Sequence, residues 1–255
     1  MLERVQATRF VLPLKEGGSL PGVVEASDDG MYVTKFRGAG QGLKALVAEV
    51  VVGELGRHLG LLVPRLVRVD VPEPIAKYEA DEEVQDLLTA SLGLNLGVDF
   101  LPGAFDYTGA RPMQREEAET LMWLDALTLN IDRTWRNPNL LLWHQQAWAI
   151  DHGAALYVHH AWPSKPPDPD RFAGLPFDLS DHVARELVGD MRAAHERLAP
   201  LVTRESIDAI TALVPDEWLE PGAEIATPAD ARSAYAELLL ARLARPEAWL
   251  PGGAA

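Results

Sequence analysis

The sequence predicts an α+β fold, with a small β-rich N-terminal lobe that contains one helix and a larger, mainly helical C-terminal lobe. Two observations support this prediction. Short apolar stretches separated by glycine turns fill the first 36 residues, as in antiparallel strands. After residue 113, apolar residues recur mainly at helical spacing, with one hairpin pattern between the predicted helices. We place the lobes at residues 1–100 and 101–255, because residues 95–103 form an extended segment that suits a boundary.

Strand and helix patterns in the N-terminal lobe can be assigned in order. Asp28-Asp29-Gly30 is a hairpin turn signal between two of the apolar stretches. The predicted strands cover residues 5–14, 22–26, 31–36, 62–69 and 95–103. Leu46, Val47 and Val50 recur at helical spacing and predict a helix over residues 43–59, with Gly60 as its C-cap.

The C-terminal lobe is predicted to contain three long helices and one hairpin. The first helix covers residues 114–130, and a strand pair follows at residues 140–150. Ser180 is the predicted cap of a second helix that extends to Leu198. The tetrapeptide that starts at Thr227 combines an N-cap, a proline at the first helical position and an acidic third position, so it predicts the third helix.

Composition excludes several classes of protein. The chain has 255 residues, 47% of them hydrophobic, so it is long enough to bury a core and is neither collagen-like nor wholly disordered. It has no cysteine, which excludes disulfide frameworks, zinc ribbons and thiol nucleophiles. The net charge of −15 disfavours phosphate backbones and anionic lipid, so we expect neither nucleic acid nor a membrane as a partner. The sequence shows neither a recognisable targeting signal nor an apolar run long enough to span a bilayer, so we expect a cytoplasmic protein.

A group of polar residues lies around the predicted hairpin. Asp132 is followed five positions later by Asn137, and the hairpin leads to Asp151 in an Asp-x-Gly sequence. Phosphoryl transfer needs one carboxylate to orient the acceptor and take its proton, and an amide oxygen and another carboxylate to hold the metal. Mg²⁺ prefers oxygen ligands, which Asn137 and Asp151 would supply. Asn139 is an alternative to Asn137, and we favour Asn137 on spacing.

The N-terminal lobe contains residues that suit phosphate binding. Lys35 ends an apolar strand, and Glu49 on the following helix is its predicted partner. Glu54 is the competitor, but five residues correspond to about 140° of rotation, so only one of the two faces the strand. Glu49 lies beside the apolar positions of the helix and is preferred. A turn whose backbone N–H groups could cover phosphates is formed by Gly17, Gly18 and Ser19.

These residues together resemble the HipA-like kinase domain, within the wider protein-kinase and phosphoinositide-kinase-like fold. The resemblance spans residues 16–160 and lies in the segments EGGSLPGVVEASDDGMYVTKF, AEVVVGELGRHLGLLVP, SLGLNLGVDFLPG, NIDRTWRNPNLLLW and AIDHGAALYVHH. The spacing of Asp132 and Asn137 equals that in the kinase sequence H-R-D-x-x-x-x-N. The Asp132-Arg133 pair is also similar to the D-R-H-x-x-N of lipid kinases.

The resemblance implies a bilobal protein-kinase-like fold with an ATP and Mg²⁺ site between the lobes. The roles it implies are Asp132 as catalytic base, Asn137 and Asp151 as Mg²⁺ ligands, and Lys35, braced by Glu49, as the phosphate-binding lysine. The expected hinge for adenine is residues 98–101, with Asp99 and Phe100 at its centre.

The expected activity is therefore transfer of the γ-phosphoryl group of ATP to a hydroxyl, foremost that of Ser or Thr in an unidentified protein. A small-molecule or lipid kinase is an alternative, because the same Asp–Asn–Asp set serves alcohol acceptors generally. A nucleotide-binding pseudokinase that acts as a partner-binding module is another. It stays open because Asn130 and Ile131 stand where protein kinases have His and Arg, and because the glycine loop is not G-x-G-x-x-G.

Overall fold

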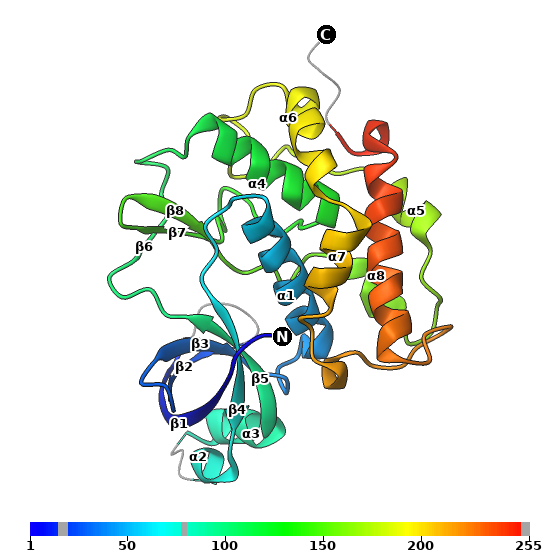
Figure 1. The fold of residues 1–255 in the computed structure, drawn as a ribbon. Coiled ribbons are helices and arrows are strands. Elements are labelled where there is room, and N and C mark those ends of the chain that lie inside the picture. The colour runs from blue at the N-terminus through cyan, green and yellow to red at the C-terminus, as the bar shows by residue number, and fades with distance from the viewer. Residues whose placement is uncertain (15–19, 78–80, 251–255) are drawn as a thin grey trace. The chain divides into compact units, whose positions relative to one another are not determined.

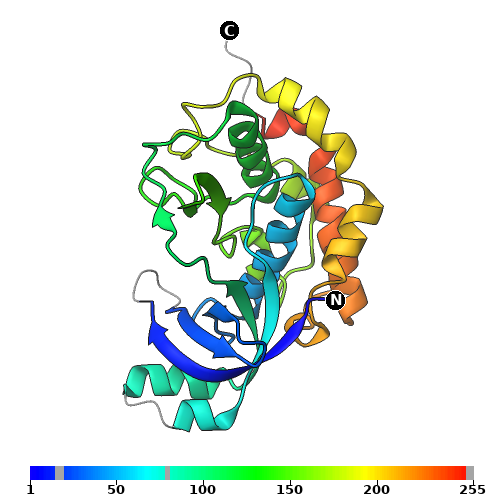
Figure 2. The same cartoon turned by 60° about the vertical axis from the view of Figure 1, so that its left-hand side comes forward.

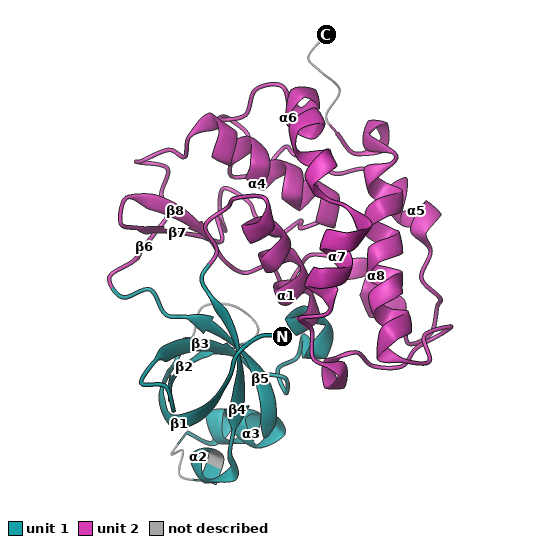
Figure 3. Ribbon diagram, viewed as in Figure 1, with its two compact units in different colours: residues 1–46, 64–102 teal, residues 47–63, 103–255 magenta. Residues whose placement is uncertain are grey.

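The computed structural model describes residues 1–14, 20–77 and 81–250, and its chain forms two compact units (Figures 1 and 3). Unit 1 consists of residues 1–46 and 64–102, and unit 2 of residues 47–63 and 103–255. The helix α1, Gly42–His58, has its first turn in unit 1 and its remainder in unit 2. The crossing from unit 1 to unit 2 after residue 102 lies two residues beyond the predicted lobe boundary at residue 100. Residues 47–63, which the prediction places in the N-terminal lobe, group with unit 2 instead.

A closed five-stranded barrel forms the body of unit 1, with the strand order β1-β2-β3-β5-β4. Its strands are β1 Arg4–Pro13, β2 Gly22–Ala26, β3 Met31–Lys35, β4 Leu66–Val71 and β5 Gly93–Asp99. The barrel closes where β1 pairs in parallel with β4; the other pairs are antiparallel. Valines and aromatic residues that alternate along the strands fill its interior. A Cβ at Gly97 of β5 would lie 2.5 Å from Val69, so this position requires glycine.

Two short helices cover part of this barrel (Figure 2). They are α2, Glu73–Lys77, and α3, Glu82–Ala90, and Val84 and Leu88 of α3 belong to the same buried cluster as the barrel valines. Asp81 caps α3 by accepting the backbone N–H groups of Glu83 and Val84.

The predicted strand at residues 62–69 begins late, at Leu66. Pro64 has no N–H to donate to a neighbouring strand, and the carbonyl of Leu62 instead accepts the N–H of Ala149. The first three predicted strands and the predicted helix over residues 43–59 are confirmed to within one residue at every end.

Unit 2 consists of helices and one three-stranded sheet with the order β6-β7-β8. The strands are β6 Phe105–Asp106, β7 Leu140–Trp143 and β8 Gln146–Ala149. Besides the larger part of α1, its helices are α4 Arg115–Thr128, α5 Pro169–Ala173, α6 Met191–Leu198, α7 Arg204–Thr211 and α8 Pro228–Leu243. Short 3-10 turns lie at Tyr157–Ala161, Ala199–Leu201, Asp216–Trp218 and Pro246–Ala248. Most side chains of α4 are buried, because other parts of unit 2 surround it. The buried Arg242 of α8 donates to Ala126 of α4 and to Phe172 of α5, which ties these helices together.

The prediction of a helix that starts at Ser180 is wrong for the first ten residues of that helix. Helix α6 begins only at Met191, after the N-cap Asp190. The preceding residues form turns whose groups bond elsewhere: the N–H of Gly189 donates to Glu119, and the His182 side chain turns inward to Asp125. These tertiary hydrogen bonds override the helical spacing of the apolar residues. By contrast, the predicted start of α8 at Thr227 is confirmed.

Within the part of the chain that the structure describes, no helix has both the length and the apolar character needed to cross a lipid bilayer.

Candidate active site

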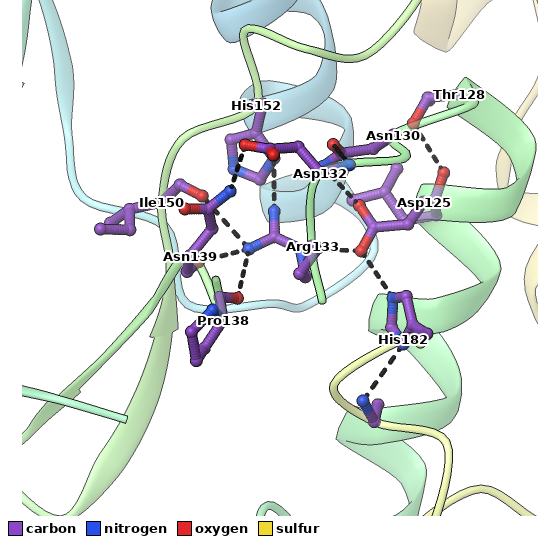
Figure 4. Close-up of polar contacts among 12 residues, drawn as sticks. Asp125, Thr128, Asn130, Asp132, Arg133, Pro138, Asn139, Ile150, His152 and His182 are labelled. Atoms are coloured by element: carbon purple, nitrogen blue, oxygen red, sulfur yellow. Dashed lines mark hydrogen bonds and ion pairs between the residues drawn. The ribbon is translucent and has the colours of Figure 1, made fainter. Parts of the chain in front are cut away.

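The loop that follows α4 carries Asp132 and is tied back onto that helix (Figure 4). The residue at the C-cap of α4, Leu129, has a left-handed backbone with φ of 54°. Asn130 then donates its side-chain Nδ2 to Oδ1 of Asp125 at 2.9 Å and accepts the N–H of Asp132 at 3.4 Å. Asp132 therefore starts the loop from a fixed position, and its side chain remains partly exposed.

The carboxylate of Asp132 accepts hydrogen bonds from two asparagines. The Nδ2 groups of Asn137 and Asn139 lie 2.9 Å and 3.1 Å from its Oδ2 atom. Both amides use their nitrogen here, so their Oδ1 oxygens face away from this bond and retain their acceptor capacity. The structure thus brings together three of the residues considered from the sequence, including both alternatives for the amide ligand.

The β7–β8 hairpin brings Asn139 beside Ile150, the residue that precedes Asp151. Leu140 of β7 pairs with Ala149 of β8, and the carbonyl of Asn139 accepts the N–H of Ile150 at 3.1 Å. Asp151 directly follows Ile150, has a left-handed backbone with φ of 55°, and is exposed. Asn137 lies two residues before Asn139 in the loop, where its N–H donates to Thr134.

The chemistry of this donor set fits Mg²⁺. Asp132 and Asp151 offer carboxylate oxygens, and the two asparagines offer amide oxygens, which are the ligands that this hard cation prefers. Within residues 1–14, 20–77 and 81–250, no group of three or more His, Cys, Asp or Glu side chains could hold a metal. Mg²⁺ does not require one, because in kinase-type sites it is held by one or two carboxylates together with substrate phosphates.

Beneath the loop, Asp125 of α4 is a buried carboxylate with three partners. Its Oδ2 accepts Nε of Arg133 at 2.7 Å and Nε2 of His182 at 3.0 Å, and its Oδ1 accepts the amide of Asn130. The side chains of Asp125 and Arg133 are both fully buried. Desolvation alone would raise the pKa of Asp125, but Arg133, His182 and His152 outweigh it and hold that pKa below its usual value. Asp125 is therefore an ionised buried group.

Sequence reasoning gave no role to Asp125 or Arg133. A signal was available: Asp125 interrupts a long apolar run within the predicted helix, at positions 121–129. A charge at the centre of such a run is rarely buried without a partner of opposite charge. The partner could not be identified from the pattern, because Arg133 lies beyond the end of the helix.

The predicted phosphate-binding residues lie on β3 and α1. Lys35 is the last residue of β3, opposite Leu96, and is half-buried. Glu49 is buried in α1, whereas Glu54 forms an ion pair with Arg57 one turn further along the helix. The preference for Glu49 over Glu54 stays a prediction. The pairing of Lys35 with Glu49 stays a prediction, and Gly17, Gly18 and Ser19 lie outside the described residues.

The predicted hinge residues lie at the end of β5. The N–H of Asp99 donates to the backbone carbonyl of Arg65 at 2.8 Å, and the N–H of Phe100 donates to the backbone carbonyl of Met31 at 3.0 Å. Desolvation raises the pKa of the Asp99 carboxyl, an effect that Arg65 partly opposes. Both N–H groups already donate to carbonyls within unit 1. These two residues would therefore bind a ligand through their oxygen atoms rather than through their backbone N–H groups. Their contact with a nucleotide stays a prediction.

Comparison with known proteins identifies the family. A family model described as HipA-like kinase matches residues 8–251. The chain belongs to the HipA-like kinase family. Among solved structures, the proinflammatory kinase CtkA of Helicobacter pylori is similar with a TM-score of 0.54 and 12% identity, over 91% of this chain and 90% of that one. A Golgi casein kinase is 13% identical, with a TM-score of 0.41 over 96% of this chain and 72% of that one. No curated protein sequence matches.

The family and the likeness to CtkA confirm two predictions made from the sequence. One is the HipA-like resemblance, and the other is the kinase-like α+β fold with a β-rich N-terminal region and a helical C-terminal region. Membership in this family also supports a kinase-type phosphotransferase, for which ATP is the phosphoryl donor.

Proposed function

We propose that this HipA-like kinase transfers the γ-phosphoryl group of ATP, as its Mg²⁺ complex, to the hydroxyl of a Ser or Thr in a protein. The observation that carries the proposal is the arrangement around Asp132. Its carboxylate is held by the amides of Asn137 and Asn139, and the hairpin fixes Asn139 beside the residue that precedes Asp151.

In the proposed reaction, Asp132 orients the acceptor hydroxyl and takes its proton. The hydroxyl oxygen forms a bond to the γ-phosphorus while the bond to the β-phosphate oxygen breaks, and ADP leaves. The two amide hydrogen bonds hold the Asp132 carboxylate in one orientation. Mg²⁺, when bound, neutralises charge on the phosphates, and Lys35 adds a positive charge for the same purpose.

We favour Asn139 over Asn137 as the amide ligand that accompanies Asp151. The sequence spacing favoured Asn137, but the hairpin pairs Asn139 with Ile150, one residue before Asp151. Asn139 is also half-buried, whereas Asn137 is exposed, so less conformational entropy is lost when Asn139 binds an ion. Asn137 then serves mainly to hold Asp132.

A protein acceptor is favoured by the side chains on either side of Asp132. Ile131 is 63% exposed and Trp135 is 58% exposed, and Arg136 stacks on the Trp135 ring at 4.0 Å. Large apolar side chains next to a catalytic carboxylate suit the neighbouring side chains of a peptide better than a small polar metabolite. The net charge of −15 disfavours an anionic membrane as the acceptor surface.

The metal and nucleotide part of the proposal is tested by thermal unfolding with ATP, with and without Mg²⁺. Saturation at about 100 times Kd adds about 2.7 kcal/mol to the free energy of unfolding. We expect a rise in Tm that requires Mg²⁺ and is lost in Asp151→Ala. Asn139→Ala should weaken the Mg²⁺ effect more than Asn137→Ala does. No shift in the wild type would contradict the proposal.

The transfer itself is tested with radiolabelled ATP and a mixture of cellular proteins and metabolites. Wild type should label protein Ser or Thr, and Asp132→Ala should bind ATP with Mg²⁺ without labelling. Label found only in a metabolite or lipid would indicate a small-molecule or lipid kinase. Nucleotide binding without any labelled product would indicate a pseudokinase.

A further inference from the structure

Arg133 uses its whole guanidinium group inside unit 2. The residue is 1% exposed, and its three nitrogen atoms all donate to named partners (Figure 4). Nε donates to Asp125, Nη2 to Nδ1 of His152, and Nη1 to backbone carbonyls. The planar guanidinium is the side-chain group whose rigid fork of donors can serve several buried acceptors at once.

The carbonyls that Nη1 contacts belong to both sides of the proposed metal site. One is the carbonyl of Asn139, with that of Pro138 at 3.5 Å, and the other is the carbonyl of Ile150 at 3.2 Å. Asn139 is the proposed amide ligand, and Ile150 directly precedes the proposed carboxylate ligand Asp151. A single planar group thus joins the backbone beside both ligands.

Asp125 fixes the orientation of this planar group. It accepts Nε of Arg133 at 2.7 Å, and it is itself held by Asn130 and by His182. The Nδ1 atom of His182 accepts the N–H of Ala184, so Nε2 carries the proton that is donated to Asp125. The guanidinium is therefore oriented by a carboxylate that is not among the proposed metal ligands.

We propose that Arg133 is a positioning residue for the Mg²⁺ site: it sets the spacing between the backbone of Asn139 and that of Asp151, so that both side chains bind one ion. The inference rests on the proposed function. Arg133 touches neither ATP nor the acceptor in this role. Residues that orient metal ligands from behind change metal affinity by about 10- to 100-fold when they are replaced.

The test uses Arg133→Lys in the full chain. Lysine keeps the positive charge beside Asp125, but its single ammonium cannot donate in a planar fork to Asp125 and to both carbonyls. Arg232 on α8 provides a matched control, because it donates to the carbonyls of Thr211 and Val214 and to the carboxylate of Asp216. Arg232→Lys removes the same kind of fork, also in unit 2, from residues outside the 125–152 region.

The measured quantity is the binding of a non-hydrolysable ATP analogue by calorimetry, at a series of Mg²⁺ concentrations. We expect Arg133→Lys to need about 10- to 100-fold more Mg²⁺ for half of the metal-dependent gain in affinity. Its affinity for the analogue without metal should stay at the wild-type value. Arg232→Lys should match the wild type in both quantities, even where its Tm falls.

An unchanged Mg²⁺ requirement in Arg133→Lys, with a lower Tm, would overturn the inference and leave Arg133 a purely structural residue. Absence of any Mg²⁺ effect in the wild type would instead overturn the proposed function, and the inference with it. Should Arg133→Lys not fold, the double variant Asp125→Asn/Arg133→Gln removes both buried charges together, which is far less destabilising than removing one. The same rise in Mg²⁺ requirement is expected of it.

Discussion

Thr34 of β3 is a buried residue whose hydroxyl finds no hydrogen-bond partner among the described residues. It is 0% exposed and lies on the same face of the strand as Tyr32, which belongs to the core of the barrel. A buried hydroxyl without a partner costs about 1–3 kcal/mol, and valine has nearly the same shape without the polar atom. We therefore expect Thr34→Val to raise the free energy of unfolding by about 1 kcal/mol in urea denaturation.

Thr128 of α4 is a matched control for this prediction. It is also 0% exposed, but its hydroxyl donates to the carbonyl of Leu124 at 2.8 Å. Thr128→Val removes a satisfied hydrogen bond, so it should lower the free energy of unfolding by about 1 kcal/mol. The prediction fails if both substitutions change stability in the same direction.

At this scale the candidate site was only partly predictable. Asp132, Asn137 and Asp151 could be selected because they lie at short, fixed spacings around one hairpin. The Asp125–Arg133 pair could not, because the contact forms only when the chain folds back below α4. The choice between Asn137 and Asn139 likewise depends on the strand pairing, which the spacing alone does not reveal.

Among the elements, local hydrogen bonds decided which helix ends could be predicted. The start of α8 follows from four consecutive residues: Thr227 accepts the N–H of Asp230, and the Asp230 carboxylate accepts the N–H of Thr227. The Thr227 hydroxyl and then the Thr227 backbone N–H, which both donate to the Asp230 carboxylate, lower the pKa of Asp230. The closure of the barrel by β1 and β4 could not be predicted, because the residues that pair, such as Arg4 and Arg68, are more than 60 positions apart in the sequence.

Removal of this cap should shorten and destabilise α8. We expect Thr227→Ala to lower the free energy of unfolding by about 1 kcal/mol, since N-cap hydroxyls contribute about that much. Thr227→Ser keeps the hydroxyl and should remain within a few tenths of a kcal/mol of the wild type. Chemical denaturation of the three proteins measures the difference, and equal losses in Ala and Ser variants would show that the hydroxyl is not the cause.

For the molecule as a whole, the buried Asp125–Arg133 pair links stability to pH. The pKa of Asp125 is lowered in the folded state relative to about 3.9 in the unfolded chain. Its contribution to folding is therefore complete above about pH 4 and is lost as pH falls through the lower folded-state pKa. At neutral pH the Asp125→Asn variant leaves Arg133 without a counter-charge, which costs about 3–5 kcal/mol.

The pH dependence separates this pair from the many surface carboxylates of an acidic chain. We expect the difference in unfolding free energy between wild type and Asp125→Asn to be constant from pH 7 to about pH 5, and to shrink below about pH 4, because the unfolded wild-type chain then takes up a proton on Asp125 that the folded chain does not. Asp208→Asn, at the exposed ion pair with Arg204, should change stability by less than about 1 kcal/mol at pH 7. Urea titrations at several pH values measure both differences. A wild-type advantage over Asp125→Asn that persisted in full at pH 2 would mean that Asp125 stabilises the fold through its shape and hydrogen bonds rather than through its charge.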